Sequence, residues 1–346
     1  MTEKQKILVA MSGGVDSSVA AAILMDQGYE VVGVTMKLWG GTSDTGCCSV
    51  SDVIDARRVA DQLGIEHHVF NFGDEFDSYV VDPYVEAHKM GETPNPCIEC
   101  NRHVKFDKLF RRATALGFDL IATGHHAQIV RQPEGLRLAR SMDTKKDQSY
   151  VLHMLKEKQL QRLRFPIGEI TKSQVREMAS SLSLQTAGKA DSQDVCFISR
   201  TKGGRHRFLE ERMEMTPGEV IDPQGKQIAN VPAIQMVTIG QRKGLGVSGK
   251  GEPRYVIDVD IESATVTAGS KGDLFCNETP IVNIQWVGDP ISGVIDIQTS
   301  AHGRPVKARV DEKIFWEHPH TKIAPGQSAV FYDDNKVVGS AVVSKS

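Results

Sequence analysis

The sequence predicts an α/β domain with a parallel sheet, followed by two modules built mainly from β-strands. Three observations support this fold class. In the first half of the chain, short apolar runs alternate with longer amphipathic runs that stop at glycine, the pattern of repeated β-α units. From about residue 216 onward, short β-rich runs are separated by Gly, Pro and Asp. A chain of 346 residues also exceeds the size of one ordinary domain.

The expected elements of the first domain alternate between strand and helix. We expect strands over residues 6–11, 30–36, 67–72 and 120–123, and helices over 17–27, 50–63, 76–90 and 106–116. Gly28 and Gly64 directly follow the first two helices, where glycine commonly ends a helix. The stretch TPNPCIECN is expected to form a loop before the last of these helices.

The second half is expected to contain strands alone. They are predicted over 236–239, 255–259 and 265–267, and after Pro280 over 293–299, 306–310, 327–332 and 336–343. This spacing is typical of small all-β modules, the last of them a barrel or a sandwich. We place boundaries near 205 and 280, which gives domains 1–205, 206–280 and 281–346.

Composition excludes several classes of protein. The longest uninterrupted apolar run, Val19–Met25, is too short to span a bilayer. The run Ile7–Met11 is not expected to be a signal peptide, because it stops at SGG with no site that resembles a cleavage site. Six unevenly spaced cysteines do not form a secreted disulfide framework. We therefore expect a cytoplasmic protein with reduced thiols and no membrane partner.

The net charge of −3 hides an asymmetry along the chain. Residues 1–100 carry 6 Lys and Arg against 16 Asp and Glu, whereas residues 101–200 carry 18 against 10. A basic middle third is typical of a surface that faces a polyanion, with ordinary solvated helix faces as the alternative.

The strongest local signal is SGGVDSS at Ser12–Ser18, between an expected strand and an expected helix. Two glycines let backbone N–H groups approach phosphate oxygens, and the start of the following helix adds the positive end of its dipole. Asp16 is a candidate ligand for Mg²⁺ at those phosphates. A tight turn with a capping aspartate is the structural alternative, but position and composition together favour a phosphate-binding loop.

This loop resembles that of the PP-loop ATP pyrophosphatases. Enzymes of that class cleave ATP between the α and β phosphates and activate an oxygen as an adenylate. They include GMP and asparagine synthetases, NAD synthetase and the tRNA-thiolating enzymes. The loop alone does not choose among them.

Three cysteines narrow the choice. Cys97 and Cys100 form a CxxC ahead of an expected helix, and Cys196 follows about a hundred residues later. Thiols near a helix start have lowered pKa values and become nucleophiles. Structural zinc is the alternative, but zinc usually takes four ligands in paired spacing, and the sequence has no second CxxC.

ATP activation together with two separated thiols indicates sulfur transfer. An adenylated carbonyl carbon is electrophilic, and a cysteine persulfide can deliver sulfur to it. A second thiolate can attack the persulfide linkage, which releases sulfide or leaves a disulfide bond. Cys196 and Cys100 fit these two roles if the fold brings them together.

A series of motifs runs along the chain in one order: SGGVDSS, VVGVTMKLW, CCS, DARRVADQLGI, TPNPCIECN, KFDKL, ATGHHA, KDQSYVL, DSQDVCFI, TIGQRKGLG and PGQSAVFY. In this order they resemble the tRNA-specific 2-thiouridylases of the MnmA type over nearly the whole chain. The resemblance implies an adenine-nucleotide α-hydrolase-like (PP-loop) domain, a small central domain and a C-terminal β-barrel. It also implies ATP-dependent 2-thiolation of the tRNA wobble uridine, by adenylation of its C2 oxygen and sulfur transfer from a cysteine persulfide.

The resemblance assigns roles to residues in matching motifs. Cys100 is expected to be the nucleophile and Cys196 the persulfide carrier. ATP is expected to contact Ala10, Met11, Ser12, Gly13, Gly14, Val15, Asp16, Ser17, Met36 and Gly124, with Mg²⁺ at Asp16. The target base or tRNA is expected to contact Asn95, Pro96, Cys97, His125, Lys146, Asp147, Gln148 and Gln327. Further partners implied are the tRNAs for Lys, Glu and Gln, and a persulfide donor such as a cysteine desulfurase or relay protein.

Two departures from the family pattern affect these roles. Many members have Asp at the position of Cys97, an acid/base candidate beside the nucleophile. A thiol there raises the hypothesis that Cys97, Cys100 and Cys196 together ligate a 4Fe-4S cluster with one open iron. In the last domain, TSAHGR (Thr299–Arg304) replaces the usual Arg-Tyr-rich tRNA contact, so that contact is not carried over.

Two other functions fit parts of the sequence. An adenylating synthetase or amidotransferase would use the same loop with ammonia and would not need thiols. An RNA-binding module with a vestigial nucleotide loop would not need ATP turnover. Replacing the two cysteines or Asp16 therefore distinguishes these functions from sulfur transfer.

Overall fold

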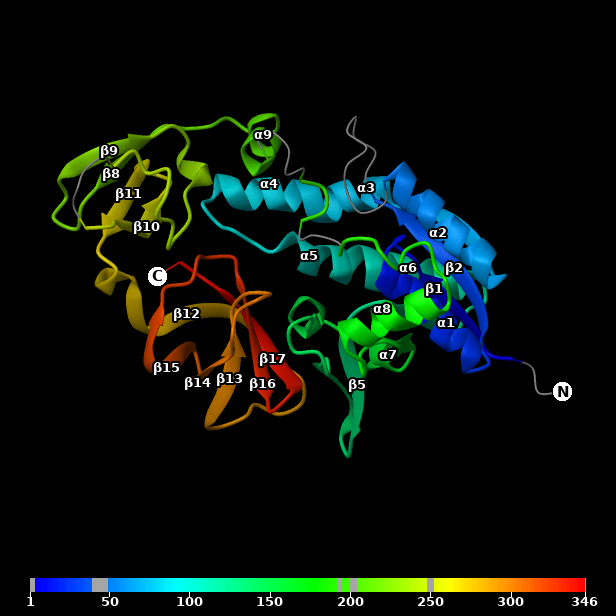
Figure 1. The fold of residues 1–346 in the computed structure, drawn as a ribbon. Coiled ribbons are helices and arrows are strands. Elements are labelled where there is room, and N and C mark those ends of the chain that lie inside the picture. The colour runs from blue at the N-terminus through cyan, green and yellow to red at the C-terminus, as the bar shows by residue number, and fades with distance from the viewer. Residues whose placement is uncertain (1–3, 39–48, 192–194, 199–203, 248–251, 346) are drawn as a thin grey trace. The chain divides into compact units, whose positions relative to one another are not determined.

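The computed structural model describes residues 4–38, 49–191, 195–198, 204–247 and 252–345 (Figure 1). The chain divides into two compact units. Unit 1 comprises Met1–Val80, Pro96–Ser199 and Asn335–Val337, and unit 2 comprises Val81–Asn95, Arg200–Asp334 and Val338–Ser346. The three domain ranges 1–205, 206–280 and 281–346 stay a prediction.

Unit 1 is built on a five-stranded sheet in which all neighbouring strands are parallel. Its strand order is β3 (Glu66–Asn71), β2 (Glu30–Lys37), β1 (Lys6–Ala10), β4 (Leu120–Thr123) and β7 (Leu163–Arg164). The central strands β1 and β4 are almost wholly buried, as strands covered on both faces must be. The predicted α/β domain with a parallel sheet is confirmed.

One face of this sheet is covered by three helices: α1 (Val15–Asp26), α2 (Val50–Leu63) and α8 (Lys172–Ser181). Their buried side chains, among them Val19, Val59 and Val175, form one core with Ile7 and Val9 of β1. Leu8, between those two residues, is also fully buried and points to the opposite face. The sheet is therefore packed on both sides.

The helical segment that carries the CxxC motif begins earlier than expected. It consists of α5 (Pro96–Glu99), the π-helix η2 (Cys100–Lys108) and α6 (Leu109–Ala115). The prediction that TPNPCIECN is a loop is therefore wrong from Pro96 onward. Proline is well suited to the first helical position, because its fixed φ is helical and no N–H is needed there.

Several elements of unit 1 were not expected from the sequence. They are the hairpin of β5 (Ala127–Gln132) and β6 (Gly135–Arg140), the 3-10 helix η3 (Ser149–Leu152) and the short helix α7 (Glu157–Leu160). The helix expected over 76–90 is divided into α3 (Gly73–Phe76), the π-helix η1 (Asp77–Val81) and α4 (Asp82–Lys89), the last of which belongs to unit 2. Short elements with little periodicity leave no clear pattern in a sequence.

The first module of unit 2 is a four-stranded sheet with the order β10 (Tyr255–Asp260), β11 (Thr265–Gly269), β8 (Gly218–Ile221) and β9 (Gln227–Val231). It follows helix α9 (Gly204–Glu210). The prediction of a strand over 236–239 is wrong. The 3-10 helix η4 (Ile234–Met236) ends there instead, and it lets the side chains of Ile234 and Val237 both pack in the core of the module.

The second module of unit 2 is a closed six-stranded barrel. The strands follow the order β12 (Phe275–Trp286), β15 (Lys313–Thr321), β14 (Val306–Val310), β13 (Val294–Gln298), β16 (Ser328–Asp333) and β17 (Lys336–Val343), and β17 pairs again with β12. Phe331 and Trp316 fill its core. The predicted β-rich central module and C-terminal barrel are confirmed, and the barrel, not the sandwich, is the form observed.

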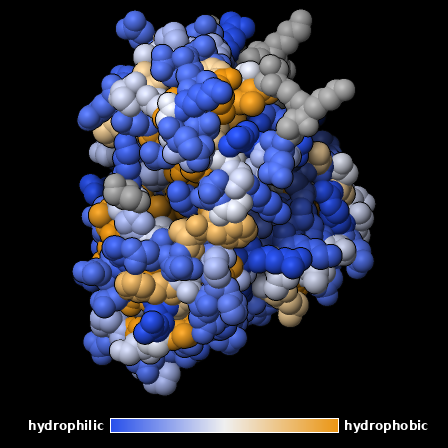
Figure 2. All heavy atoms as spheres, turned by 90° about the vertical axis from the view of Figure 1, so that its left-hand side faces the viewer, coloured by the Kyte–Doolittle hydropathy of each residue, from blue (hydrophilic) through white to orange (hydrophobic). Residues whose placement is uncertain are grey.

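The surface carries hydrophobic side chains only in small groups on the face drawn in Figure 2, where hydrophilic residues predominate. Among the described residues, no helix is both long and apolar enough to cross a bilayer.

Candidate nucleotide and thiol site

The loop between β1 and α1 is held in a tight turn by hydrogen bonds of its own serine side chains. The backbone N–H of Ser12 donates to Ser17 Oγ at 3.2 Å, and the hydroxyls of Ser17 and Ser18 donate to the carbonyl of Gly14 at 3.2 and 2.8 Å. Gly13 has φ +70°, and a Cβ there would lie 2.3 Å from the carbonyl oxygen of Asp52. Only glycine fits at position 13, since both the backbone conformation and the space exclude a side chain.

Lys189 ties this loop to α2. Its ammonium lies 2.9 Å from the carbonyl oxygen of Gly13, 2.8 Å from Asp52 and 2.6 Å from Asp55. Burial alone would lower the pKa of Lys189, but the hydrogen bonds to the two aspartates raise it. The loop therefore has a protonated lysine on its outer side.

Two predicted nucleotide contacts lie at the carboxyl ends of β2 and β4, the strands on either side of β1. Gly124 follows β4, and a Cβ there would come within 2.5 Å of the backbone nitrogen of Ser17. Met36 lies near the end of β2 and is buried. Strands β1, β2 and β4 are adjacent, so the sheet brings Met36 and Gly124 to the edge where the Ser12–Ser17 loop begins. Ligands of open α/β sheets bind at such edges.

Asp16 is engaged by two basic residues. Lys172 Nζ lies 2.7 Å from both carboxylate oxygens, and His126 Nε2 lies 3.3 Å from one of them. Burial alone would raise the pKa of Asp16, but the hydrogen bonds from His126 and Lys172 lower it below its usual value. A Mg²⁺ ion at Asp16 would have to share this carboxylate with an ammonium group already in contact with it.

Cys100, the first residue of η2, is buried, and three neighbouring groups affect the pKa of its thiol. The pKa is raised to about 12, with burial as the largest cause; the positive charge of Lys105 opposes this rise, and Cys196 and Cys97 add to it. None of the three cysteines forms a disulfide bond, and all lie within unit 1. The fold therefore brings Cys196 into the electrostatic neighbourhood of Cys100, from about a hundred positions along the chain.

The described residues contain no preformed site for a single metal ion. Within the described ranges, which include Cys97, Cys100 and Cys196, no group of three or more His, Cys, Asp or Glu side chains is arranged to hold a metal ion. The iron–sulfur hypothesis stays a prediction. Cys47 and Cys48 lie outside the described residues.

The residues of KDQ, expected to contact tRNA, make hydrogen bonds or ion pairs inside unit 1. Lys146 forms an ion pair with Asp191 at 2.7 Å, and Gln148 Oε1 accepts from the backbone N–H of His126 at 2.9 Å. The side chain of Asp147 is 5% exposed and accepts four hydrogen bonds. Of the three side chains, that of Lys146 is the most exposed to an incoming RNA.

His125 and Gln327 occupy different surroundings. His125 packs between the rings of Phe106 and Phe165, and its Nδ1 lies 2.7 Å from Thr123 Oγ1. Burial holds the pKa of His125 well below its usual value, so the ring is neutral. In unit 2, the side-chain amide of Gln327 donates to the carbonyl of Thr93, two positions before Asn95. The contacts of these residues with tRNA stay predictions.

Sequence reasoning missed Lys105, His126, Lys172 and Asp191. Lys172 is 156 positions from Asp16 in sequence, and no local pattern connects the two. Lys105 follows Cys100 by five positions. This spacing indicates that the two side chains are close only once the segment is known to be a π-helix.

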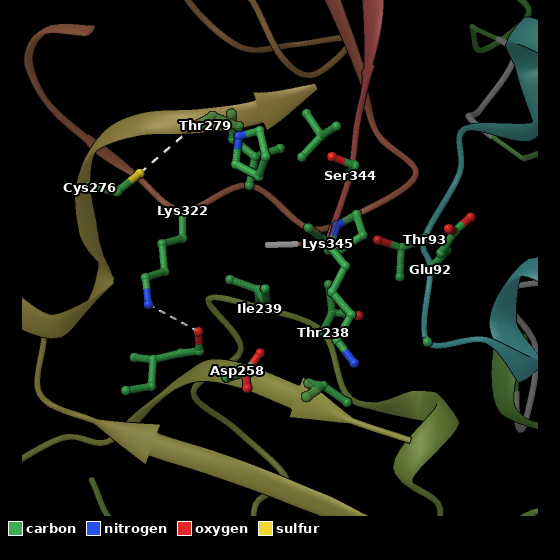
Figure 3. Close-up of a pocket in the computed structure, with 18 of the residues that line it drawn as sticks. Glu92, Thr93, Thr238, Ile239, Asp258, Cys276, Thr279, Lys322, Ser344 and Lys345 are labelled. Carbon is green, nitrogen blue, oxygen red and sulfur yellow. Dashed lines mark hydrogen bonds between the residues drawn. The ribbon is translucent and has the colours of Figure 1, made fainter. Parts of the chain in front are cut away.

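A separate cavity of about 410 Å³ lies within unit 2 (Figure 3). Its lining includes Thr238, Asp258, Lys322 and Lys345, and no residue expected from the sequence to act at the site. Positive and negative side chains line it together, so its charge favours neither an anion nor a cation.

Three family models match the chain. The tRNA methyl transferase HUP domain matches residues 5–200, the tRNA methyl transferase PRC-barrel domain matches 206–270, and the aminomethyltransferase beta-barrel domain matches 278–343. These matches agree with the parallel-sheet domain, the central β module and the closed barrel described above.

Named relatives match over their full length. The tRNA-specific 2-thiouridylase MnmA of Chloroflexus aggregans is 43% identical over 353 residues, which cover 98% of each chain. The protein of the same name from Carboxydothermus hydrogenoformans is 42% identical, covering 99% of this chain and 98% of its own. Among solved structures, the U34-tRNA thiolase NcsA from Methanococcus maripaludis is 20% identical with a TM-score of 0.36, over 53% of this chain and 59% of that one. That last likeness is too distant to add to the family match.

Proposed function

The chain belongs to the MnmA family of tRNA-specific 2-thiouridylases, and on that premise we propose that it uses ATP to replace the C2 oxygen of the tRNA wobble uridine by sulfur. The observation that carries this proposal is the position of Cys196 in the electrostatic neighbourhood of Cys100, within the unit that also holds the Ser12–Ser17 loop. A synthetase that uses ammonia has no need for two such thiols.

The first step is adenylation of the uridine. The C2 oxygen attacks the α phosphorus of ATP, the bond to the β phosphate breaks, and pyrophosphate leaves. The Ser12–Ser17 loop and the start of α1 supply N–H groups and hydroxyls for the phosphates. The product carries AMP on C2, which makes that carbon electrophilic.

The second step transfers sulfur. The terminal sulfur of a persulfide on Cys196 attacks C2, and AMP leaves with the original oxygen. The Cys100 thiolate then attacks the Cys196 sulfur, which frees 2-thiouridine and leaves a Cys100–Cys196 disulfide. Alternatively, Cys100 attacks the persulfide first and releases hydrosulfide, which attacks C2. Both routes end in the same disulfide, which a thiol reductant reduces by two electrons before the next turnover.

The chemistry requires Cys100 to lose its proton. Burial raises the pKa of Cys100, so the thiol is protonated at neutral pH in the resting protein. Lys105 is the positive charge that favours the thiolate. Entry of the persulfide and the target base changes the surroundings of this thiol during the reaction.

The partners are tRNA and a protein that supplies persulfide sulfur. We propose the tRNAs for Lys, Glu and Gln as substrates, with Asn95, Pro96 and Cys97 at the target base. Lys146 is exposed enough to contact the RNA backbone, and Arg and Lys residues between 131 and 164 add charge there. Such contacts position the RNA without reading its sequence.

The test is nucleoside mass spectrometry of tRNA from cells that lack this protein and carry the wild type, Cys100→Ser, Cys196→Ser or Cys276→Ser. Cys276 is a free thiol of the barrel module in unit 2 and serves as the matched control. We expect wobble 2-thiouridine with the wild type and Cys276→Ser, and none with the other two variants.

Other outcomes separate the alternatives. Persistence of wobble 2-thiouridine in the deletion strain would end the proposal. Unchanged wobble 2-thiouridine in both Cys100→Ser and Cys196→Ser would contradict the roles proposed for the two thiols. A fifth strain that carries Asp16→Ala tests the nucleotide loop, and unchanged 2-thiouridine in it would contradict a role of this carboxylate in the use of ATP.

A further inference from the structure

Lys189 contacts the backbone of the predicted nucleotide loop directly. Its Nζ donates to the carbonyl oxygen of Gly13 at 2.9 Å and to the carboxylates of Asp52 and Asp55 at 2.8 and 2.6 Å. Both aspartates belong to the first two turns of α2. Lys189 itself lies 176 positions after Gly13, in the segment that follows α8. One ammonium group therefore joins three parts of unit 1 at the loop.

A second residue of the same segment holds the next carbonyl of the loop. Thr186 Oγ1 donates to Ser18 Oγ at 3.1 Å, and Ser18 Oγ donates to the carbonyl oxygen of Gly14 at 2.8 Å. The side chains of Thr186 and Ser18 are both buried. The carbonyl groups of Gly13 and Gly14 are therefore both fixed, the first by Lys189 and the second through Ser18.

The direction of these carbonyls sets the direction of two N–H groups. A trans peptide group is planar, so its N–H points opposite to its C=O. Because the carbonyl of Gly13 is turned toward Lys189, the N–H of Gly14 is turned away from it. The carbonyl of Gly14 sets the N–H of Val15, the first residue of α1, in the same way. N–H groups at such a helix start are the donors that bind phosphate.

Lys189 also offsets negative charge beside the loop. Burial alone would lower the pKa of Lys189, but the hydrogen bonds to Asp52 and Asp55 raise it, so the ammonium is charged at neutral pH. Without this ammonium, two carboxylates next to Gly13 would repel a triphosphate. Its position is therefore favourable for an anion in two ways, through the backbone and through charge.

We propose that Lys189 is a positioning residue for the nucleotide phosphates. By holding the carbonyl of Gly13, it directs the N–H of Gly14 toward the phosphates, and by pairing with Asp52 and Asp55 it reduces their repulsion. Lys189 acts through the loop and does not itself need to touch the nucleotide. This inference rests on the proposed function, which supplies the ATP. Its consequence is selective, since the phosphates should depend on Lys189 and the adenosine part should not.

The experiment compares two ligands on the full chain without tRNA. Binding of α,β-methylene-ATP with Mg²⁺ is measured by calorimetry, and binding of adenosine is measured by its competition with that nucleotide. The variants are Lys189→Met, Lys189→Arg, Asp55→Asn and Lys6→Met. Lys6→Met is the matched control, because Lys6 begins the strand that leads to the loop but its ammonium lies 3.3 Å from Glu30.

We expect Lys189→Met to bind α,β-methylene-ATP about tenfold more weakly than the wild type, since a hydrogen bond from a charged donor is lost. The same variant should bind adenosine as tightly as the wild type. Lys189→Arg keeps the charge and the N–H donors, so it should recover most of the lost affinity. Asp55→Asn leaves the contact between Lys189 and Gly13, so it should bind the nucleotide at least as tightly as the wild type. Lys6→Met should bind both ligands normally.

Three results would overturn the inference. The first is nucleotide binding by Lys189→Met as tight as by the wild type. The second is an equal loss of nucleotide and adenosine binding in that variant, which would indicate a general folding defect. The third is a loss in Asp55→Asn as large as in Lys189→Met, which would make the ion pair decisive and not the contact with Gly13. All three leave the proposed function intact if the wild type binds the nucleotide and thiolates tRNA, whereas a wild type that binds no nucleotide would contradict both.

Discussion

Lys105 follows Cys100 by five positions on the π-helix that Cys100 begins, which is the spacing joined by the hydrogen bonds of such a helix. Burial raises the pKa of the Cys100 thiol to about 12, and the charge of Lys105 opposes this rise. In an α-helix the residue four positions on would share this face instead. The π-helix is therefore part of how the predicted nucleophile acquires a neighbouring cation.

Replacing Lys105 by Met should slow the reaction of Cys100 with iodoacetamide. Without the cation the pKa of Cys100 rises further, so less thiolate is present at any pH below it. We expect a decrease of about tenfold, the effect of one pKa unit. The measurement is the pH dependence of alkylation at Cys100 by mass spectrometry.

Lys108→Met is the control, because Lys108 lies on the same helix but over the ring of Tyr79. Equal rates in the two variants would contradict the role of Lys105.

Acid should destabilise unit 1 through His153. This residue is 8% exposed, and in the described structure neither ring nitrogen has a hydrogen-bond partner. Burial, with a smaller effect of Arg102, lowers the pKa of His153 to about 3. Below pH ~6.5 the unfolded chain takes up a proton that the folded chain does not, so stability falls as pH decreases toward 3. This residue contributes at most about 1.4 kcal/mol per pH unit.

The variant His153→Leu should therefore lose less stability in acid than the wild type. Urea unfolding at pH 7, 6 and 5 measures the difference. We expect the free energy of unfolding of the variant to fall by about 1 kcal/mol less per pH unit. Parallel pH profiles for the two proteins would show that His153 is protonated, or solvated, in the folded state.

Asp147→Ala should lower the stability of the fold, and it should not remove a direct contact with RNA. The buried carboxylate accepts from the Arg140 guanidinium at 3.0 Å, from the backbone N–H groups of Ser141 and Ser149, and from the Ser149 hydroxyl. Its removal leaves the Arg140 guanidinium, on a side chain that is 16% exposed, without this partner, at a cost of about 3 kcal/mol. Chemical unfolding measures the loss. A variant with unchanged stability and weakened tRNA binding would instead make Asp147 a direct tRNA contact.

Gly326→Ala should disturb the segment that leads to the predicted base-contacting residues. Gly326 has φ +85°, and a Cβ there would lie 3.1 Å from Glu92 Cβ and 3.3 Å from the backbone nitrogen of Thr93. Thr93 itself donates to the carbonyl of Pro325 at 2.9 Å. Gly225→Ala is the control, since Gly225 has φ +81° and no atom within 4 Å of such a Cβ.

The two glycine variants share the cost of a left-handed backbone, about 1 kcal/mol. We expect Gly326→Ala to lower the thermal midpoint more than Gly225→Ala, and to increase proteolysis near residues 92–95. Equal effects in the two variants would mean that the close approach of Gly326 to Glu92 and Thr93 is relieved without cost.

Part of the site could be predicted because its signals are local. The Ser12–Ser18 motif lies between a strand and a helix, and the structure shows that Gly13 has no room for a side chain. The number and spacing of the cysteines also predict a reactive pair, and this role stays a prediction. The prediction of a loop from Pro96 to Cys100 is wrong, because a loop rich in proline and a helix that begins at proline look alike in sequence.

The sequence by itself determined the classes of structure: a parallel α/β sheet, a β-rich module and a barrel. The spacing of hydrophobic residues indicates whether a segment forms a helix or a strand and which of its faces is buried. Both depend on residues that are close together in the sequence. Only the tertiary structure decided that Lys172 contacts Asp16 and Asp191, that Cys196 lies near Cys100, and that Asp147 is enclosed. Ion pairs and thiol pairs between distant positions depend on which strands end at the same edge of a sheet, and no local pattern records that.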